Sequence, residues 1–170
     1  MQIDLFHLEK LAAEEGLLLR IQVRRPLNIW ALKVVVAQYF QSDKVKIWGE
    51  MKAWAYEGKS GLQLDTMRVN PLAPKGVAHL IWAATMSWAL ENTSCKNARL
   101  LAIRDDEKQH SRLVKYFLRR GFRKTREVGS APIDLPLRLI WGGSGELMIA
   151  DCNEVLNQSY KLWKLSAKSY

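Results

Sequence analysis

Residues 62–90 constrain the fold more than any other part of this 170-residue chain. Side chains in 62–69 alternate well enough to predict a β-strand. Pro71 and Pro74 end that strand, because proline cannot donate a hydrogen bond to a ladder. After Gly76, apolar residues recur at helical spacing and predict a long helix: Val77, Leu80, Ile81, Ala84 and Trp88. The segment is therefore expected to form a strand, a short loop and a helix.

Gly76 stands at the start of a helix that follows a strand. Backbone N–H groups at such a place can approach an anion, and the positive end of the helix dipole favours negative charge. This arrangement suggests phosphate or pyrophosphate binding. The same pattern also suits an ordinary strand–helix turn, so geometry alone leaves both interpretations open.

The loop resembles that of the GNAT N-acetyltransferases, in which a strand ends in a Val-x-Pro turn. In that family, Arg/Gln-x-x-Gly-x-Gly/Ala holds the pyrophosphate of acetyl-CoA. This chain has Val69-Asn70-Pro71 and then residues 73–78, Ala-Pro-Lys-Gly-Val-Ala. The Gly-x-Gly/Ala half is present, whereas Ala73 stands where the family has Arg or Gln, and Pro74 removes one N–H.

The resemblance implies that acetyl-CoA is a co-substrate and that the loop binds it. The residues implied in binding its phosphates are Lys75, Gly76, Val77 and Ala78. Family strands splay from their parallel neighbour at the preceding strand end. Backbone N–H groups near Arg68 and Val69 are therefore implied to polarise the thioester carbonyl.

A second family landmark is a helix that runs Asn-x-x-Ala, has a Tyr about seven residues on, and closes with Gly-Phe. Gly121-Phe122 meets the ending. Counting back places His110 at the Asn position and Phe117 at the Tyr position, with Tyr116 adjacent. The resemblance implies that His110 contacts coenzyme A and that Tyr116 is the acid for the leaving thiolate.

The rest of the chain predicts the other elements of the sheet and its helices. Helices are expected at 4–15, at 27–40 and from 105 to 121, strands at 17–23, 44–56, 99–103 and 122–128, a hairpin of 137–141 and 146–150, and a last amphipathic segment through Trp163. Val34-Val35-Val36 leaves a strand possible within 27–40.

This order of elements predicts one α/β domain over 1–170. It resembles the three-layer GNAT fold, a mixed central sheet flanked by helices, most clearly over 51–141. Only one long strand is expected between the helix at 27–40 and the turn at Gly58, and there the chain departs from the family.

Positive charge is concentrated in residues 96–126, which hold eleven Lys and Arg against three acidic residues, or +8 of the chain's +9. A helical stripe within it carries Lys108, Arg112, Lys115 and Arg119. Such a field attracts polyanions, so an acidic protein or a nucleic acid is a candidate partner. A solvated helix face that keeps the chain in solution is the alternative interpretation.

Several function classes find no support in the sequence. No apolar run approaches 18 residues, so no membrane span is expected. Two cysteines and the absence of a signal-like N-terminus predict a reducing compartment, the cytoplasm. His7, His79 and His110 lack metal-ligand spacing with each other or with the cysteines, and no metal site is expected.

Two hypotheses follow. The first is an N-acetyltransferase in which Asp65 or Glu50, on strands that face the acceptor slot in the family, is the general base. The second is a GNAT-like domain without turnover, a binding or assembly module that meets an acidic partner through its basic helix. The loops carry no signal for the acceptor or for the oligomeric state.

Overall fold

A computed structural model describes residues 2–168, with the backbone alone at Ser42. Seven strands form one mixed sheet in the order β1-β2-β3-β4-β5-β7-β6. They are β1 (Leu18–Arg24), β2 (Trp30–Phe40), β3 (Lys44–Ala55), β4 (Leu62–Val69), β5 (Asn97–Ile103), β6 (Arg123–Val128) and β7 (Gly145–Asp151). The helices are α1 (Leu5–Glu14), α2 (Val77–Asn92), α3 (Glu107–Arg119), α4 (Leu135–Trp141) and α5 (Cys152–Ala167). The predicted α/β class, with a mixed sheet flanked by helices, is confirmed.

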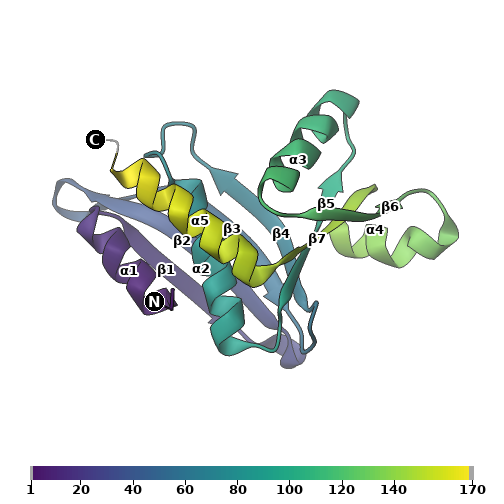
Figure 1. Cartoon of the computed structure of the whole chain (residues 1–170), viewed down its shortest axis with the longest axis horizontal. Coiled ribbons are helices and arrows are strands. Elements are labelled where there is room, and N and C mark those ends of the chain that lie inside the picture. The colour runs from purple at the N-terminus through teal and green to yellow at the C-terminus, as the bar shows by residue number, and fades with distance from the viewer. Residues whose placement is uncertain (1, 169–170) are drawn as a thin grey trace.

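The helices cover the two faces of the sheet unequally (Figure 1). α1, α2 and α5 lie over one face, and Val34 and Val36 of β2 are buried beneath them. α4 lies on the other face, where Trp141 packs against Leu101 and Leu147 in a separate small core. The second face of β1–β4 carries no helix in the part of the chain that the structure describes, so its side chains meet solvent.

The helix expected at 27–40 is wrong: residues 30–40 form β2. The three consecutive valines favour a strand, because a branched Cβ restricts χ1 in a helix and packs well on a pleated surface. Every second residue from Leu32 to Val36 is buried, the pattern of a strand with one covered face. β2 pairs with β1 and β3 and supplies the strand that the sequence analysis did not find before Gly58.

The strand expected at 137–141 is also wrong, because Leu135–Trp141 is the helix α4. Its signal is local: Pro136 lies in the first turn, where a proline costs no hydrogen bond. Gly142 then ends the helix in the left-handed region, with φ 76°. The partner strand, β7, is confirmed, but it pairs with β5 and β6 instead of forming a hairpin.

The organising segment folds as the sequence predicts, into β4, a loop and α2. β4 and β5 are parallel, and they pair only at Leu62↔Ala98 and Gln63↔Arg99. Beyond Gln63 the two strands separate while β4 stays paired with β3 as far as Val69. The other predicted strands and the helices at 4–15 and 105–121 are confirmed within a few residues, and the last amphipathic segment is α5. No helix within residues 2–168 is long and apolar enough to cross a bilayer.

Candidate functional site

The loop between β4 and α2 is built around Asn70. Its side-chain oxygen accepts a hydrogen bond from the backbone N–H of Leu72 at 2.9 Å, and its carbonyl accepts one from Ala73 at 2.9 Å. This turn brings the chain from the end of β4 to Gly76, which caps α2 with φ 90°. No side chain caps α2, so the N–H groups of its first turn lack the usual partner.

Gly76 has two structural reasons to be glycine. Its φ of 90° is rarely adopted by residues with a side chain. A Cβ there would also lie 2.9 Å from Trp163 Cδ1 and 3.0 Å from Ser166 Cβ, both on α5. Helix α5 thus passes directly over the start of α2, and Figure 1 shows the two helices overlapping. Gly76, which the sequence predicts at a phosphate site, is therefore required for this packing whether or not a phosphate binds there.

The other predicted loop residues differ in what they can offer. Lys75 is exposed, so its ammonium group is accessible to a ligand. Val77 is buried at 1% exposure, so only its backbone could face a ligand, and its N–H points to Pro74 O at 3.3 Å. Ala78 is half-buried at the second position of α2. The first turn therefore presents backbone donors with one cation beside them.

At the end of β4, the N–H groups of Arg68 and Val69, the two residues expected to polarise a thioester, point in opposite directions. The N–H of Asn70 donates to Trp48 O at 2.8 Å, toward β3. Backbone groups alternate in direction along a strand, so the N–H of Arg68 also points to β3 and that of Val69 points away. Since β5 has separated from β4 by this point, the N–H of Val69 faces the gap between the strands.

A cavity of about 60 Å³ occupies the gap between β4 and β5. Its lining includes Leu64, Asp65 and Met67 of β4, Trp82 of α2 and Phe117 of α3. Trp82 meets Phe117 and Phe122 edge-on, with ring centroids 6.2 and 5.6 Å apart. These ring contacts lie where α2 meets α3. The cavity has room for an acetyl-sized group, whereas sites for whole ligands usually measure about 300 Å³ or more.

Tyr116, the candidate acid, lies beside this cavity but does not line it. Its hydroxyl oxygen accepts a hydrogen bond from Trp82 Nε1 at 3.0 Å. The guanidinium carbon of Arg120 lies 5.0 Å from the centroid of the Tyr116 ring. Because the oxygen accepts this hydrogen bond from Trp82, the phenol keeps its own O–H for donation. Phe117, one residue on, is the side chain that reaches the cavity.

His110 is buried near the start of α3, with 8% exposure. Its Nδ1 lies 3.2 Å from Ile103 O, and its Nε2 lies 3.4 Å from Arg104 Nη2. The ring thus donates to the end of β5 and accepts from arginine. These contacts hold α3 against β5, and the coenzyme contact implied by the resemblance stays a prediction.

The two candidate bases differ in environment. Glu50 accepts a hydrogen bond from Lys33 at 2.9 Å, and this bond holds the pKa of the carboxyl below its usual value. A carboxylate paired in this way is a weak base. Asp65 is exposed at a register shift between β3 and β4, and it lines the cavity between β4 and β5.

Asp65 also borders a shallow basin of about 420 Å³ on the sheet face that carries no helix. Arg24, Lys33, Lys52 and Trp54 line the same basin. Asp65 is therefore the carboxylate that links the gap in the sheet to an open surface. A reacting group could approach it from that side while a second ligand occupied the opposite side.

Sequence reasoning missed a pair of basic side chains between α2 and α3. Arg120 Nη1 lies 2.6 Å from His79 Nδ1, so the guanidinium donates to a neutral imidazole. Burial, and then the charge of Arg120, lowers the pKa of His79 to about 4. Arg120 is itself 7% exposed, and burial lowers its pKa. Its place in a basic stretch gave no sign that it turns inward.

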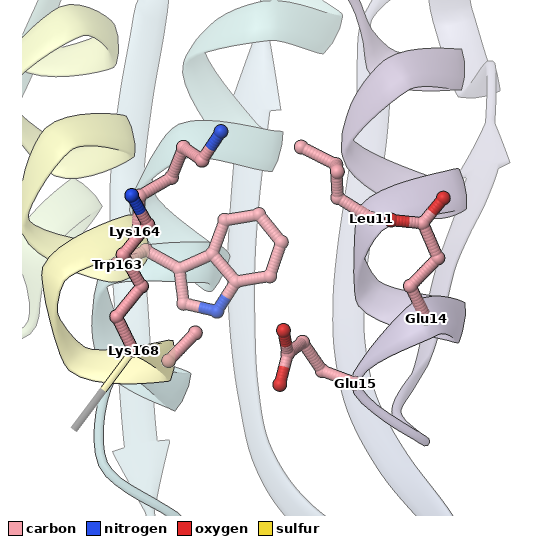
Figure 2. Close-up of a pocket in the computed structure, with 7 residues that line it drawn as sticks. Leu11, Glu14, Glu15, Trp163, Lys164 and Lys168 are labelled. Atoms are coloured by element: carbon pink, nitrogen blue, oxygen red, sulfur yellow. The ribbon is translucent and has the colours of Figure 1, made fainter. Parts of the chain in front are cut away.

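Sequence reasoning also missed a second cavity, of about 210 Å³, between α1 and α5. Figure 2 shows the indole of Trp163 between the two helices, facing Leu11 and Glu15. Glu14 and Glu15 lie on the α1 side, and Lys164 and Lys168 lie on the α5 side. The same indole packs on Gly76, so this cavity adjoins the start of α2. Within residues 2–168 no group of three or more His, Cys, Asp or Glu could hold a metal ion.

No protein-family model and no curated protein matches this chain. Solved structures do match. One is apo FdhC, described as a nucleotide-linked sugar GNAT, with a TM-score of 0.52, 10% identity and coverage of 80% of this chain and 65% of that one. An uncharacterized protein from Bacillus halodurans matches with a TM-score of 0.49, 14% identity and coverage of 81% and 66%. Nourseothricin acetyltransferase matches with a TM-score of 0.49, 13% identity and coverage of 83% and 93%.

The likeness to FdhC establishes the fold. This chain is a divergent protein of GNAT fold, with the seven-stranded mixed sheet and the parting of β4 from β5 described above. It spans about two thirds of the length of FdhC and of the Bacillus halodurans protein, 65% and 66%.

Proposed function

We propose that this chain is a coenzyme A-dependent acyltransferase that moves an acetyl group from acetyl-CoA to an amine. The observation that carries the proposal lies at the end of β4. There the strand parts from β5 after Gln63, and the next helix begins at Gly76 without a capping side chain. The first feature supplies unpaired N–H groups beside a gap in the sheet, and the second supplies an anion site.

The two ends of acetyl-CoA would meet different parts of this arrangement. The diphosphate would bind the N–H groups at the start of α2, those of Gly76 and Ala78 and, once it leaves Pro74 O, that of Val77, with Lys75 beside them. The thioester would lie in the gap between the strands, where the N–H of Val69 points at its carbonyl oxygen. Donors aimed at a developing oxyanion typically contribute about 10²–10³-fold in rate each.

The proton transfers would use Asp65 and Tyr116. Asp65 borders both the gap and the open basin, so it can accept the proton of an amine that arrives over the uncovered sheet face. Tyr116 has a proton to donate to the thiolate of coenzyme A, because its oxygen already accepts a hydrogen bond from Trp82. Glu50 is the weaker candidate base, since Lys33 holds it.

The proposal requires movement. A pantetheine arm does not fit the cavity of about 60 Å³, so Phe117 or Trp82 must rotate when the coenzyme binds. Trp82 is 1% exposed within the main core, whereas Phe117 is only partly buried against it, so Phe117 is the ring that can move more easily. The edge-on contacts that Phe117 makes with Trp82 and Phe122 typically contribute about 0.5–1.5 kcal/mol each. Coenzyme binding should therefore change the environment of Trp82.

The filled gap also favours a second candidate, the binding module without turnover. If the aromatic rings stay in place, no thioester reaches Val69, and the basic stripe of α3 becomes the main functional surface. Its four side chains, Lys108, Arg112, Lys115 and Arg119, are all exposed. This candidate predicts salt-dependent binding of a polyanion and no binding of coenzyme A.

The test is a thiol-release assay with acetyl-CoA and a panel of amines, peptides and polyamines, run on wild type and on Ala78→Asp. An acid at the second helical position suits the dipole of α2 but opposes a diphosphate, so the variant should fold normally and lose activity. Asn153→Asp is the matched control, because Asn153 is exposed at the same position of α5. Turnover unaffected by Ala78→Asp, or no turnover on any amine, would reject the proposed function.

A further inference from the structure

Arg120 is a buried cation that has no acid beside it. It follows the last residue of α3, and it is the one buried Lys or Arg side chain within residues 2–168. None of the ion pairs among these residues includes it. Asp134, the buried carboxylate in the same range, is by contrast paired with Arg126 at 2.8 Å. Burying a charge without a counter-charge costs free energy, so the unpaired Arg120 requires a reason.

The neighbours that Arg120 does have are neutral. His79 accepts one of its hydrogen bonds at 2.6 Å, and Tyr116 lies under the guanidinium. A guanidinium carries five N–H donors in a rigid planar fork. The hydrogen bond to His79 uses part of this set. The fork therefore keeps donors for a further, negatively charged acceptor.

His79 fixes where those donors lie. It is the third residue of α2, and side chains in a helix lean toward its N-terminus. The imidazole of His79 and the guanidinium of Arg120 that is hydrogen-bonded to it consequently lie beside the first turn of α2. The same turn holds the uncapped N–H groups that follow Gly76.

We propose that Arg120 is the cation that binds the diphosphate of coenzyme A at the start of α2. The inference rests on the proposed function and adds a residue to it. Ala73 leaves the loop without a basic side chain at its first position, and Arg120 supplies one from the end of α3. A guanidinium can engage a phosphate in a bidentate manner, which makes it well suited to this role.

A purely structural role for Arg120 is the competing explanation. Cations are stabilised at a helix C-terminus by the dipole, and the contact with the ring of Tyr116 is also favourable. In that case Arg120 would serve the junction of α2 and α3 and would be indifferent to ligands. The two roles predict different effects of an Arg120 substitution on the binding affinity for ligands with and without a diphosphate.

The test is calorimetric titration of wild type, Arg120→Met and Arg120→Lys with coenzyme A and with pantetheine, which lacks the diphosphate. Loss of a charge-assisted hydrogen bond should weaken coenzyme A binding by about 10- to 150-fold. Arg120→Lys should fall between, because it keeps the charge without the fork. Pantetheine should bind all three alike. Arg123→Met, the same change at an exposed residue of β6 outside the basic stripe, should stay within about twofold of wild type for coenzyme A.

The outcomes separate this inference from the proposed function. If wild type and Arg120→Met bind coenzyme A equally well, the inference about Arg120 is overturned and the proposed function stands. Equal losses for coenzyme A and pantetheine also overturn it, because they indicate a structural role. Wild type that binds no coenzyme A overturns both.

A second measurement needs no variant. The chain has three histidines, so the imidazole signals can be resolved by NMR. Coenzyme A at the start of α2 should perturb His79 and raise its pKa above about 4, because phosphate charge favours the imidazolium. A His79 signal that does not respond at saturating coenzyme A overturns the inference.

Discussion

Replacing Gly76 with alanine should destabilise this protein more than its small size suggests. The backbone there has φ 90°, and a left-handed conformation costs a non-glycine residue roughly 1–2 kcal/mol. The added Cβ would lie 2.9 Å from Trp163 Cδ1 and 3.0 Å from Ser166 Cβ. Trp163 is 3% exposed and held in the core, so it cannot move away freely. Overpacking of this kind typically costs about 1–3 kcal/mol.

The two terms together predict a loss of roughly 2–5 kcal/mol in the free energy of unfolding. For a chain of this length, each kcal/mol lowers the melting temperature by about 2–4 °C. Thermal and urea denaturation of Gly76→Ala should thus show a melting temperature roughly 4–20 °C below wild type.

Gly143→Ala is the matched control. A Cβ there lies no closer than 3.8 Å to Ile103 Cγ2, and the backbone is outside the left-handed region. It should leave the melting temperature within about 2 °C of wild type. Equal stability of Gly76→Ala and wild type would refute the described packing of α5 on α2.

Three further predictions concern the site. Protonation of His79 should destabilise the fold, because its pKa is about 4 in the folded chain and higher in the unfolded chain. The free energy of unfolding should therefore fall as the pH drops from about 6.5 to 4. In urea denaturation, His79→Gln should remove part of that fall. Tyr116→Phe should keep the affinity for acetyl-CoA and lower turnover about 10²–10⁴-fold in single-turnover kinetics, and unchanged turnover would remove it as the acid. Arg112→Glu with Arg119→Glu should leave the melting temperature within about 3 °C of wild type and weaken heparin binding and its salt dependence; binding indifferent to both would limit the basic stripe to solubility.

The sequence predicted the central unit of the fold because its signals there are local. Two prolines and a glycine separate β4 from α2, and the periodicity changes from strand to helix within a few residues. The prediction of a helix at 27–40 was wrong because the apolar residues there fit the period of a strand as well as that of a helix. What decided for a strand was pairing with β1 and β3, which no local window contains. The prediction of a strand at 137–141 was wrong for the opposite reason. Pro136 is a local signal for the start of a helix, and that signal was not used.

The site was predicted less completely than the fold. Motif positions pointed to the loop and placed Phe117 at the family's Tyr position, and Phe117 is the side chain that reaches the gap between the strands. They could not tell that Gly76 packs on α5. Arg120 was counted among eleven basic residues that formed one field. Its burial depends on how α3 ends against His79 of α2, a contact between residues 41 positions apart.

Calorimetric titration of the wild-type chain with acetyl-CoA is the decisive measurement, because acetyl transfer and the role of Arg120 both require the coenzyme at the start of α2. We expect saturable binding to one site, weakened at least tenfold by Ala78→Asp and unchanged by Asn153→Asp. No heat of binding at millimolar acetyl-CoA, together with an unchanged melting temperature, would rule out the proposed acetyl-CoA site and favour the binding module.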